Sequence, residues 1–103
     1  MGYNRRMSER PEITVQDNPD RRRYEATTDG GVVSGFADYR DRDGVRVFVH
    51  TEVDDAFGGQ GVGSTLARGA LDDVRARGLS IRAECEFIQG YLAKHPEYAD
   101  LAA

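Results

Sequence analysis

A glycine-rich turn stands directly before a helical pattern and is the part of the sequence best suited to bind a ligand. Residues 57–64 read Phe-Gly-Gly-Gln-Gly-Val-Gly-Ser, with four glycines in six consecutive positions. Glycines let a ligand approach the backbone without a clash against Cβ atoms. The first turn of a helix presents unpaired N–H groups at the positive end of the helix dipole, which favours phosphate. The turn therefore predicts a phosphate-binding site.

Two common phosphate-binding motifs do not fit this turn. A P-loop ends in Gly-Lys-Ser/Thr, whereas the only lysine of the chain is Lys94, well beyond the turn. The dinucleotide-binding fingerprint needs a third glycine three positions after its second. Counted from Gly59 and Gly61, that position is occupied by Ser64. The fingerprint also belongs to a βαβ unit, whereas the strands expected before this turn are joined by hairpins. Both nucleotide-binding motifs are therefore excluded.

Two side chains before the turn could move a proton. His50 stands at the end of an expected strand, and a neutral imidazole accepts a proton near neutral pH. Its alternative role is an ordinary ion pair with a neighbouring carboxylate at the strand end. Glu52 is a second candidate base, although a glutamate at an exposed strand end is usually only solvated. His95, beside Pro96, is expected to cap a helix.

The single cysteine lies after the turn, between an expected strand and the last expected helix. A helix N-terminus next to Cys85 would favour its thiolate, whereas the flanking Glu84 and Glu86 would disfavour it. Cys85 is therefore a candidate nucleophile opposed by local charge. The alternative is a small residue that packs in the core.

Alternating patterns before the turn predict an antiparallel meander. Short strands are expected near residues 13–15, 24–28, 32–39 and 45–51, separated by turn signals such as Asp29-Gly30 and Asp43-Gly44. In the third of these strands, we expect Val33, Ala37 and Tyr39 to share one face.

The pattern then changes to helix, strand and helix. Apolar residues from Val62 to Val74 fall on one arc of a helix, which Gly78 would end as its C′ residue. A strand at residues 79–83 would run parallel to the strand at 45–51. A last helix at residues 86–94 stops before Pro96. The predicted fold class is α/β (α+β), with the order β-β-β-β-α-β-α.

Length and composition limit the class of protein. The 103 residues support one domain, predicted at residues 12–103 after a flexible arm at residues 1–11. One cysteine forms no internal disulfide and no cysteine-based zinc site, so we expect no metal. No apolar run approaches the roughly 20 residues that span a bilayer, and the N-terminus lacks the apolar stretch of a signal peptide. We therefore expect a cytoplasmic protein without a membrane partner.

Charge is unevenly placed along the chain. Residues 1–23 carry six arginines against four acidic residues, whereas residues 24–103 carry 8 basic and 14 acidic residues. Nucleic-acid binding requires a basic patch that outweighs the rest of the domain. The run of arginines at residues 21–23 is too short for this, which argues against nucleic acid as a partner.

The stretch Gly59-Gln60-Gly61-Val62-Gly63 stands after a meander and before helix, strand and helix. In this arrangement the chain resembles the acetyl-CoA-binding core of the GNAT N-acetyltransferase superfamily, whose motif is Gln/Arg-x-x-Gly-x-Gly/Ala. Gly61 and Gly63 match its two small positions, whereas Gly58 stands where Gln or Arg is expected. The chain resembles the small single-domain members of this superfamily over about residues 24–101. The residues that carry this closer resemblance are His50-Thr51-Glu52-Val53, Cys85-Glu86-Phe87-Ile88, Tyr91 and His95-Pro96-Glu97-Tyr98.

The resemblance implies acetyl-CoA as cosubstrate, held without a metal. It implies a splay between two parallel strands, whose free backbone would pair with the pantetheine arm. His50 is then the catalytic base, and Cys85 lies at the sulfur end of the site as a catalytic or contacting residue. Tyr91 would protonate the departing thiolate. The implied binding residues are Val53, Gly59, Gln60, Gly61, Val62, Gly63, Ser64, Cys85 and Tyr91.

The implied function is transfer of an acetyl group to an amine. The chain is shorter than ordinary members, which implies that the helices usually forming the acceptor wall are absent or reduced, so the resemblance leaves the acceptor open. The acidic body favours a small cationic amine, or a protein lysine or N-terminus. The departure at Gly58 also leaves a second possibility, a non-catalytic module that binds acyl-CoA or another protein.

Overall fold

The chain passes from a β-meander to a helix, a strand and a helix, in a computed structural model that describes residues 12–54 and 61–103. This order is the one expected from the sequence. The predicted arm at residues 1–11 lies outside the described residues, so the division into an arm and a domain stays a prediction. The elements are β1 (Thr14–Asn18), β2 (Arg23–Thr28), η1 (Asp29–Gly31, a 3-10 turn), β3 (Val32–Arg42), β4 (Val45–Val53), α1 (Val62–Ala76), β5 (Ser80–Ala83), α2 (Glu86–Lys94) and η3 (Pro96–Leu101, a 3-10 segment).

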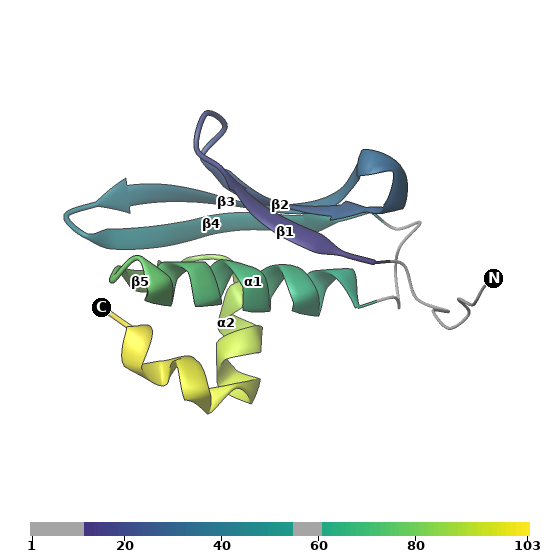
Figure 1. Cartoon of the computed structure of the whole chain (residues 1–103). Coiled ribbons are helices and arrows are strands. Elements are labelled where there is room, and N and C mark those ends of the chain that lie inside the picture. The colour runs from purple at the N-terminus through teal and green to yellow at the C-terminus, as the bar shows by residue number, and fades with distance from the viewer. Residues whose placement is uncertain (1–11, 55–60) are drawn as a thin grey trace.

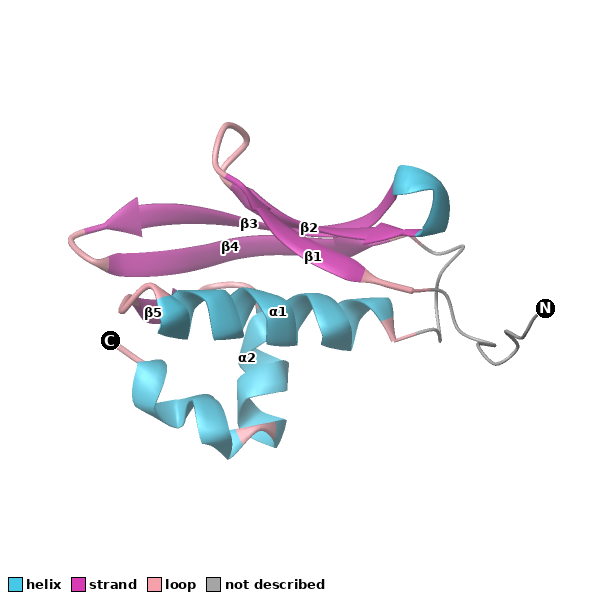
Figure 2. Ribbon diagram, in the orientation of Figure 1, coloured by secondary structure: helices cyan, strands magenta, loops and turns pink. Residues whose placement is uncertain are grey.

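One sheet carries α1, α2 and η3 on one side, whereas the short turn η1 joins β2 to β3 at one end of the sheet (Figure 1). The strands lie in the order β1-β2-β3-β4-β5, antiparallel except for the parallel pair β4–β5. This confirms the predicted mixed fold and the predicted direction of β5. Helix α1 runs along the sheet, and α2 and η3 lie on the same side (Figure 2). No helix of the described residues covers the opposite side, here called the open face, which presents Arg23, Glu25, Phe36, Asp38, Arg40, Arg42, Val45, Val47, His50, Glu52 and Arg82.

Helix α1 packs on the sheet through the predicted apolar arc. Its buried residues are Val62, Leu66, Ala67, Ala70, Leu71 and Val74. The helix ends as expected at Gly78, which has φ +72°. The N–H of Gly78 donates to Arg75 and that of Leu79 to Val74, both at 3.1 Å, which is the Schellman pattern. The turn into β5 is therefore fixed by the sequence at the end of α1.

A bulge in β3 overturns the expected position of Val33. Ala26 pairs with Gly35 but Thr27 pairs with Val33, so Ser34 is an extra residue in the ladder. Ser34 is buried, and its hydroxyl donates to the carbonyl of Ala26 at 3.1 Å. The extra residue reverses the alternation, so Val33 is 42% exposed whereas Ala37 and Tyr39 are buried as predicted.

A buried arginine joins the inner side of the sheet to α1, and the sequence analysis missed it. Arg46 donates to Asp41 at 2.7 and 2.8 Å and to the Tyr24 hydroxyl at 2.8 Å. Its guanidinium lies 3.9 Å from the centre of the Tyr39 ring. The Tyr24 hydroxyl donates in turn to Asp73 of α1 at 2.6 Å, and burial raises the pKa of Tyr24. The network therefore connects β2, β3, β4 and α1.

The last two residues of the chain pair with the outer edge of β5. Ala102 forms a parallel bridge with Ile81, and the N–H of Ala103 donates to the Ile81 carbonyl at 2.9 Å. The short strand β5 is therefore covered on both of its edges at Ile81, by β4 and by the C-terminal segment.

Gly69→Ala is expected to destabilise the fold, because α1 touches β1 at this point. A Cβ at Gly69 would lie 2.7 Å from the Cβ of Val15, and overpacking of this kind costs about 1–3 kcal/mol. Gly90→Ala in α2 is the control, since its Cβ would meet no atom within 4 Å. That change should stabilise by about 0.5–1 kcal/mol. Urea unfolding measures both free energies, and a stabilising Gly69→Ala would contradict the close contact.

Candidate functional site

The first turn of α1 combines free N–H groups with open space. Gly61 caps the helix in the left-handed region that favours glycine, at φ +81°, without a side-chain cap. A Cβ on Gly61 would meet no atom within 4 Å. The first helical hydrogen bond runs from Thr65 to the Gly61 carbonyl, so the N–H groups of Val62, Gly63 and Ser64 have no acceptor within the helix. With no acidic residue in this turn, the site can hold an anion.

Of the other residues predicted for the glycine turn, the structure describes some and not others. Gly59 and Gln60 lie outside the described residues. Val62 is 1% exposed, so it can offer a ligand only its backbone. A Cβ on Gly63 would lie 2.8 Å from Cζ of Phe87. A Cβ at position 63 would therefore have to displace the exposed ring of Phe87, which shows how closely α1 and α2 approach at this point.

The end of β4 lies against this first turn. The side chain of Val53 is 3.6 Å from the Cβ position that Gly63 lacks and 3.4 Å from that of Gly35. The predicted binding residues Val53 and Gly63 are thus neighbours. A backbone strand edge and a helix N-terminus are thereby brought to the same end of the sheet.

Strands β4 and β5 separate before they reach that end. Their last pair is Phe48 with Ala83, and the N–H of Glu84 still donates to the Phe48 carbonyl at 2.8 Å. Opposite β3, the pairing skips Val49, which is a bulge. Residues 49–53 of β4 then continue with no strand beside them on the β5 side within the described part of the chain. This is the splay that the resemblance implied.

His50 lies on the open face at the start of the splay. It pairs in register with Asp38, and its Nε2 is 2.8 Å from an Oε atom of Glu52. The side chains of His50 and Glu52 are 53% and 62% exposed. The alternative role considered for His50, a pair with a neighbouring carboxylate, is therefore present. The pair is in water, so the imidazole remains accessible to a substrate.

Cys85 approaches the splay from the other side of β4. It is buried and caps α2, and its Sγ donates to the Thr51 hydroxyl at 3.2 Å. Thr51 is the neighbour of His50 in the strand but pairs with the inward-facing Ala37. The structure thus brings His50 and Cys85 to one stretch of β4, on opposite faces. No hydrogen bond joins them among the residues described.

Tyr91 lines a hollow between the first turn of α1 and the face of α2. The hollow has a volume of about 310 Å³, and Ser64 and Lys94 also line it. The Tyr91 ring stacks on His95 with centroids 4.0 Å apart, and burial raises the pKa of Tyr91. Two predicted residues, Ser64 and Tyr91, are therefore brought together. Lys94 was not among the predicted site residues, although its position one turn after Tyr91 in α2 places it on the same face of the helix.

No group of three or more His, Cys, Asp or Glu side chains in residues 12–54 and 61–103 is arranged to hold a metal ion. None of the helices described is long and apolar enough to cross a membrane.

Comparison with known proteins places this geometry in a family. The family model of the GCN5-related N-acetyl-transferase matches residues 23–101. A GCN5-like protein of Staphylococcus aureus, solved by NMR in solution, has a TM-score of 0.65 and 30% sequence identity, covering 89% of this chain and 87% of that chain.

Curated relatives match over a shorter stretch. Protein NATD1 of Homo sapiens and of Mus musculus are each 43% identical over 47 residues, which is 46% of this chain. The match spans less than half the length of these relatives, 42% and 43% respectively. The family model, in contrast, covers both the splayed strands and the glycine turn. This chain belongs to the GCN5-related N-acetyltransferase family.

Proposed function

We propose that this protein binds acetyl-CoA and transfers its acetyl group to an amine. The observation that carries the proposal is the contact of Val53 with the first turn of α1. This contact places the free edge of β4 next to the N-terminus of α1, which can bind an anion. A ligand with a phosphate end and an extended amide arm, such as coenzyme A, fits both parts.

The residues present match the chemistry of this ligand. The N–H groups of Val62, Gly63 and Ser64 would hold the pyrophosphate, and the space over Gly61 admits it. Lys94 in the neighbouring hollow adds a positive charge. Backbone groups of residues 49–53 would pair with the amides of the pantetheine arm. The bound acetyl-CoA would supply the acetyl group as a reactive thioester.

Residues at and near the splay would carry out the proton transfers. His50 would take the proton of the incoming ammonium, and Glu52, 2.8 Å away, would orient the imidazole. Cys85, on the inner side of the same strand, would contact the sulfur end of acetyl-CoA. Tyr91 lies one and a half turns along α2 and its raised pKa keeps its hydroxyl protonated, as a donor to the departing thiolate must be.

The second candidate function is a module that binds acyl-CoA without turnover. The sequence departure at Gly58 favours it. The two functions share the binding site and differ only in whether an acceptor reacts.

Acetyl-CoA binding and turnover separate these candidates. Ligand well above its Kd should stabilise the fold by about 1–3 kcal/mol. For a domain of this size that raises Tm by several degrees, about 4–8 °C per kcal/mol. Release of free thiol with a panel of amines measures turnover. An unchanged Tm at millimolar acetyl-CoA would refute both candidates.

His50→Gln distinguishes the enzyme from the module. In the enzyme it should lower kcat while the Tm shift with acetyl-CoA persists. Cys85→Ser should weaken acetyl-CoA binding, because Cys85 acts as a contact in this proposal. Binding with no turnover for any amine, and a His50→Gln change that alters stability alone, would establish the module instead.

A further inference from the structure

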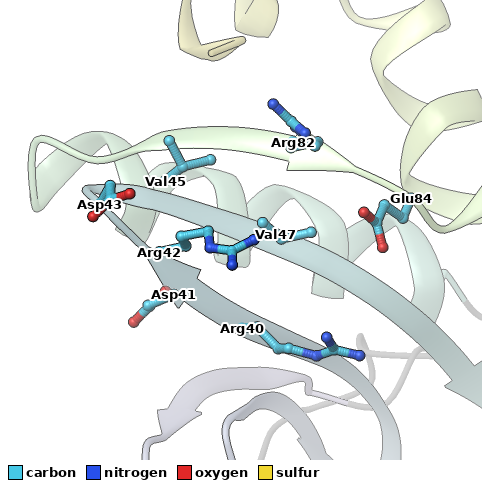
Figure 3. A pocket seen from close by; sticks show the side chains of 8 residues that line it. All are labelled: Arg40, Asp41, Arg42, Asp43, Val45, Val47, Arg82 and Glu84. Carbon is cyan, nitrogen blue, oxygen red and sulfur yellow. The ribbon is translucent and has the colours of Figure 1, made fainter.

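The open face carries a cavity beside the splay that the acetyl-transfer chemistry does not use. It has a volume of about 440 Å³, within the size range of small-molecule sites. Val45 and Val47 line it, on the side of β4 opposite Arg46 and Phe48. Figure 3 shows these valines between charged side chains of two neighbouring segments. One segment is β3 with the hairpin after it, and the other is β5 with Glu84 after it.

Three arginines surround the two valines. Arg40 and Arg82 are the partners of Val47 on either side, and Arg42 is the partner of Val45. All three are exposed, and none makes an ion pair or side-chain hydrogen bond within the part of the chain that the structure describes. Asp41, which also lines the cavity, is engaged by Arg46. The cavity thus offers three guanidinium groups that form no ion pair among the described residues, with Asp43 and Glu84 also in its lining.

The opposite sign of charge lies towards the splay. Glu84 stands where β5 leaves β4, and Asp38 and Glu52 flank His50 on the open face. Asp43, at the far hairpin, is the remaining acidic residue of the cavity lining. The open face therefore carries a basic row at Arg40, Val47 and Arg82 and carboxylates around His50, where a nearby arginine, Arg23, is paired with Glu25. With a strand rise near 3.3 Å, the row and His50 are about 7–10 Å apart.

The geometry points to an acceptor that carries both charges: a small primary amine with a carboxylate or phosphate group about 7–10 Å from its nitrogen. This inference rests on the proposed acetyl transfer. The carboxylates at the splay attract the ammonium towards His50, and Arg40 and Arg82 bind the anionic group, with Val47 against the chain between them. It differs from the purely cationic acceptor that the acidic composition favours, because local charge acts on a bound substrate more strongly than net charge.

Matched amines test the acceptor class. Rates of thiol release are compared for 6-aminohexanoate and 6-aminohexyl phosphate against hexylamine, and for glycine, whose charges are too close together. The two long anionic amines should exceed hexylamine in kcat/KM by roughly tenfold or more, and glycine should not. The better of the two anionic amines identifies the anion. Equal kcat/KM for hexylamine and both anionic amines would overturn the inference.

Arginine variants locate the effect. Arg40→Gln and Arg82→Gln should each reduce the preference for the anionic amine by roughly fivefold to tenfold. Arg21→Gln, an exposed arginine in the β1–β2 turn, removes the same charge and should leave the preference unchanged. A preference that survives both open-face changes would also overturn the inference.

A binding measurement separates this inference from the proposed function. Calorimetric titration of 6-aminohexanoate needs no turnover. Binding that Arg40→Gln abolishes, without acetylation of any amine, would keep the site and refute acetyl transfer. Acetylation of hexylamine, with no arginine-dependent binding of the anionic amines, would keep acetyl transfer and refute the site.

Discussion

Gly61→Glu should abolish the rise in Tm that acetyl-CoA produces. The new carboxylate would stand beside the N–H groups of the first turn of α1, where the pyrophosphate is proposed to bind. It would repel the phosphates and fill the space that is open over Gly61. At ligand well above Kd, the whole stabilisation of about 1–3 kcal/mol should disappear.

Gly30→Glu is the matched control for this change. Gly30 has φ +83° against +81° at Gly61, and a Cβ there also meets no atom within 4 Å. Both variants therefore carry the same added charge and the same backbone strain, about 1–2 kcal/mol for a non-glycine residue in this region. Only Gly61→Glu should lose the response to acetyl-CoA. If both variants keep the same Tm shift, the first turn of α1 is not the phosphate site.

Arg46→Ala should lower the free energy of unfolding by about 3–5 kcal/mol. The Arg46 side chain is 6% exposed, and its removal leaves the buried carboxylate of Asp17, 8% exposed, with one charged partner, Arg77 at 3.4 Å, and the hydrogen bond from the Tyr39 hydroxyl. The Tyr24 hydroxyl loses a donor, and the Tyr39 ring loses the guanidinium that covers it. Urea unfolding followed by tyrosine fluorescence measures the loss.

Two further variants separate buried charge from charge in general. Arg46→Lys keeps the charge but not the paired donation to Asp41. Its free energy of unfolding should therefore lie between those of the wild type and Arg46→Ala. Arg75→Ala removes an exposed pair with Asp100, with side chains 43% and 62% exposed, and should cost much less than Arg46→Ala because water screens the pair. Equal losses for Arg46→Ala and Arg75→Ala would show that the buried network contributes no more than a surface pair.

Local sequence signals account for most of the fold. The arc from Val62 to Val74, the C′ glycine at position 78 and the pair Asp43-Gly44, with φ +53° and +80°, each act through neighbours in the chain. The structure confirms all three. The bulge at Ser34 depends on the register between β2 and β3, which no local pattern contains. That is why the alternation misplaced Val33.

The buried arginine shows a second limit of pattern reading. In the alternation Val45-Arg46-Val47-Phe48, nothing in the spacing tells which side is inside. Arg46 is inside because Asp41, Tyr24 and Tyr39 offer acceptors and a ring face from other strands. Partners that are distant in sequence decide such a position.

The sequence predicted which residues belong to the candidate site better than it predicted their arrangement in space. His50, Cys85 and the glycine turn were all predicted from residue type, order and the family resemblance. Their distribution over two faces of β4 follows from the bulge at Val49, which shifts the pairing with β3. The arginines of the open face come from β3 and β5, so only the pairing of both strands with β4 shows that they surround one cavity.

The pairing of Ala102 and Ala103 with Ile81 bears on self-association. An uncovered strand at the border of a sheet is a template on which another chain can add its own strand. Here β5 has only four residues, and the C-terminal segment occupies the hydrogen-bonding positions at Ile81 on its outer side. We therefore expect this segment to oppose strand addition at β5, through the backbones of two alanines and no particular side chain.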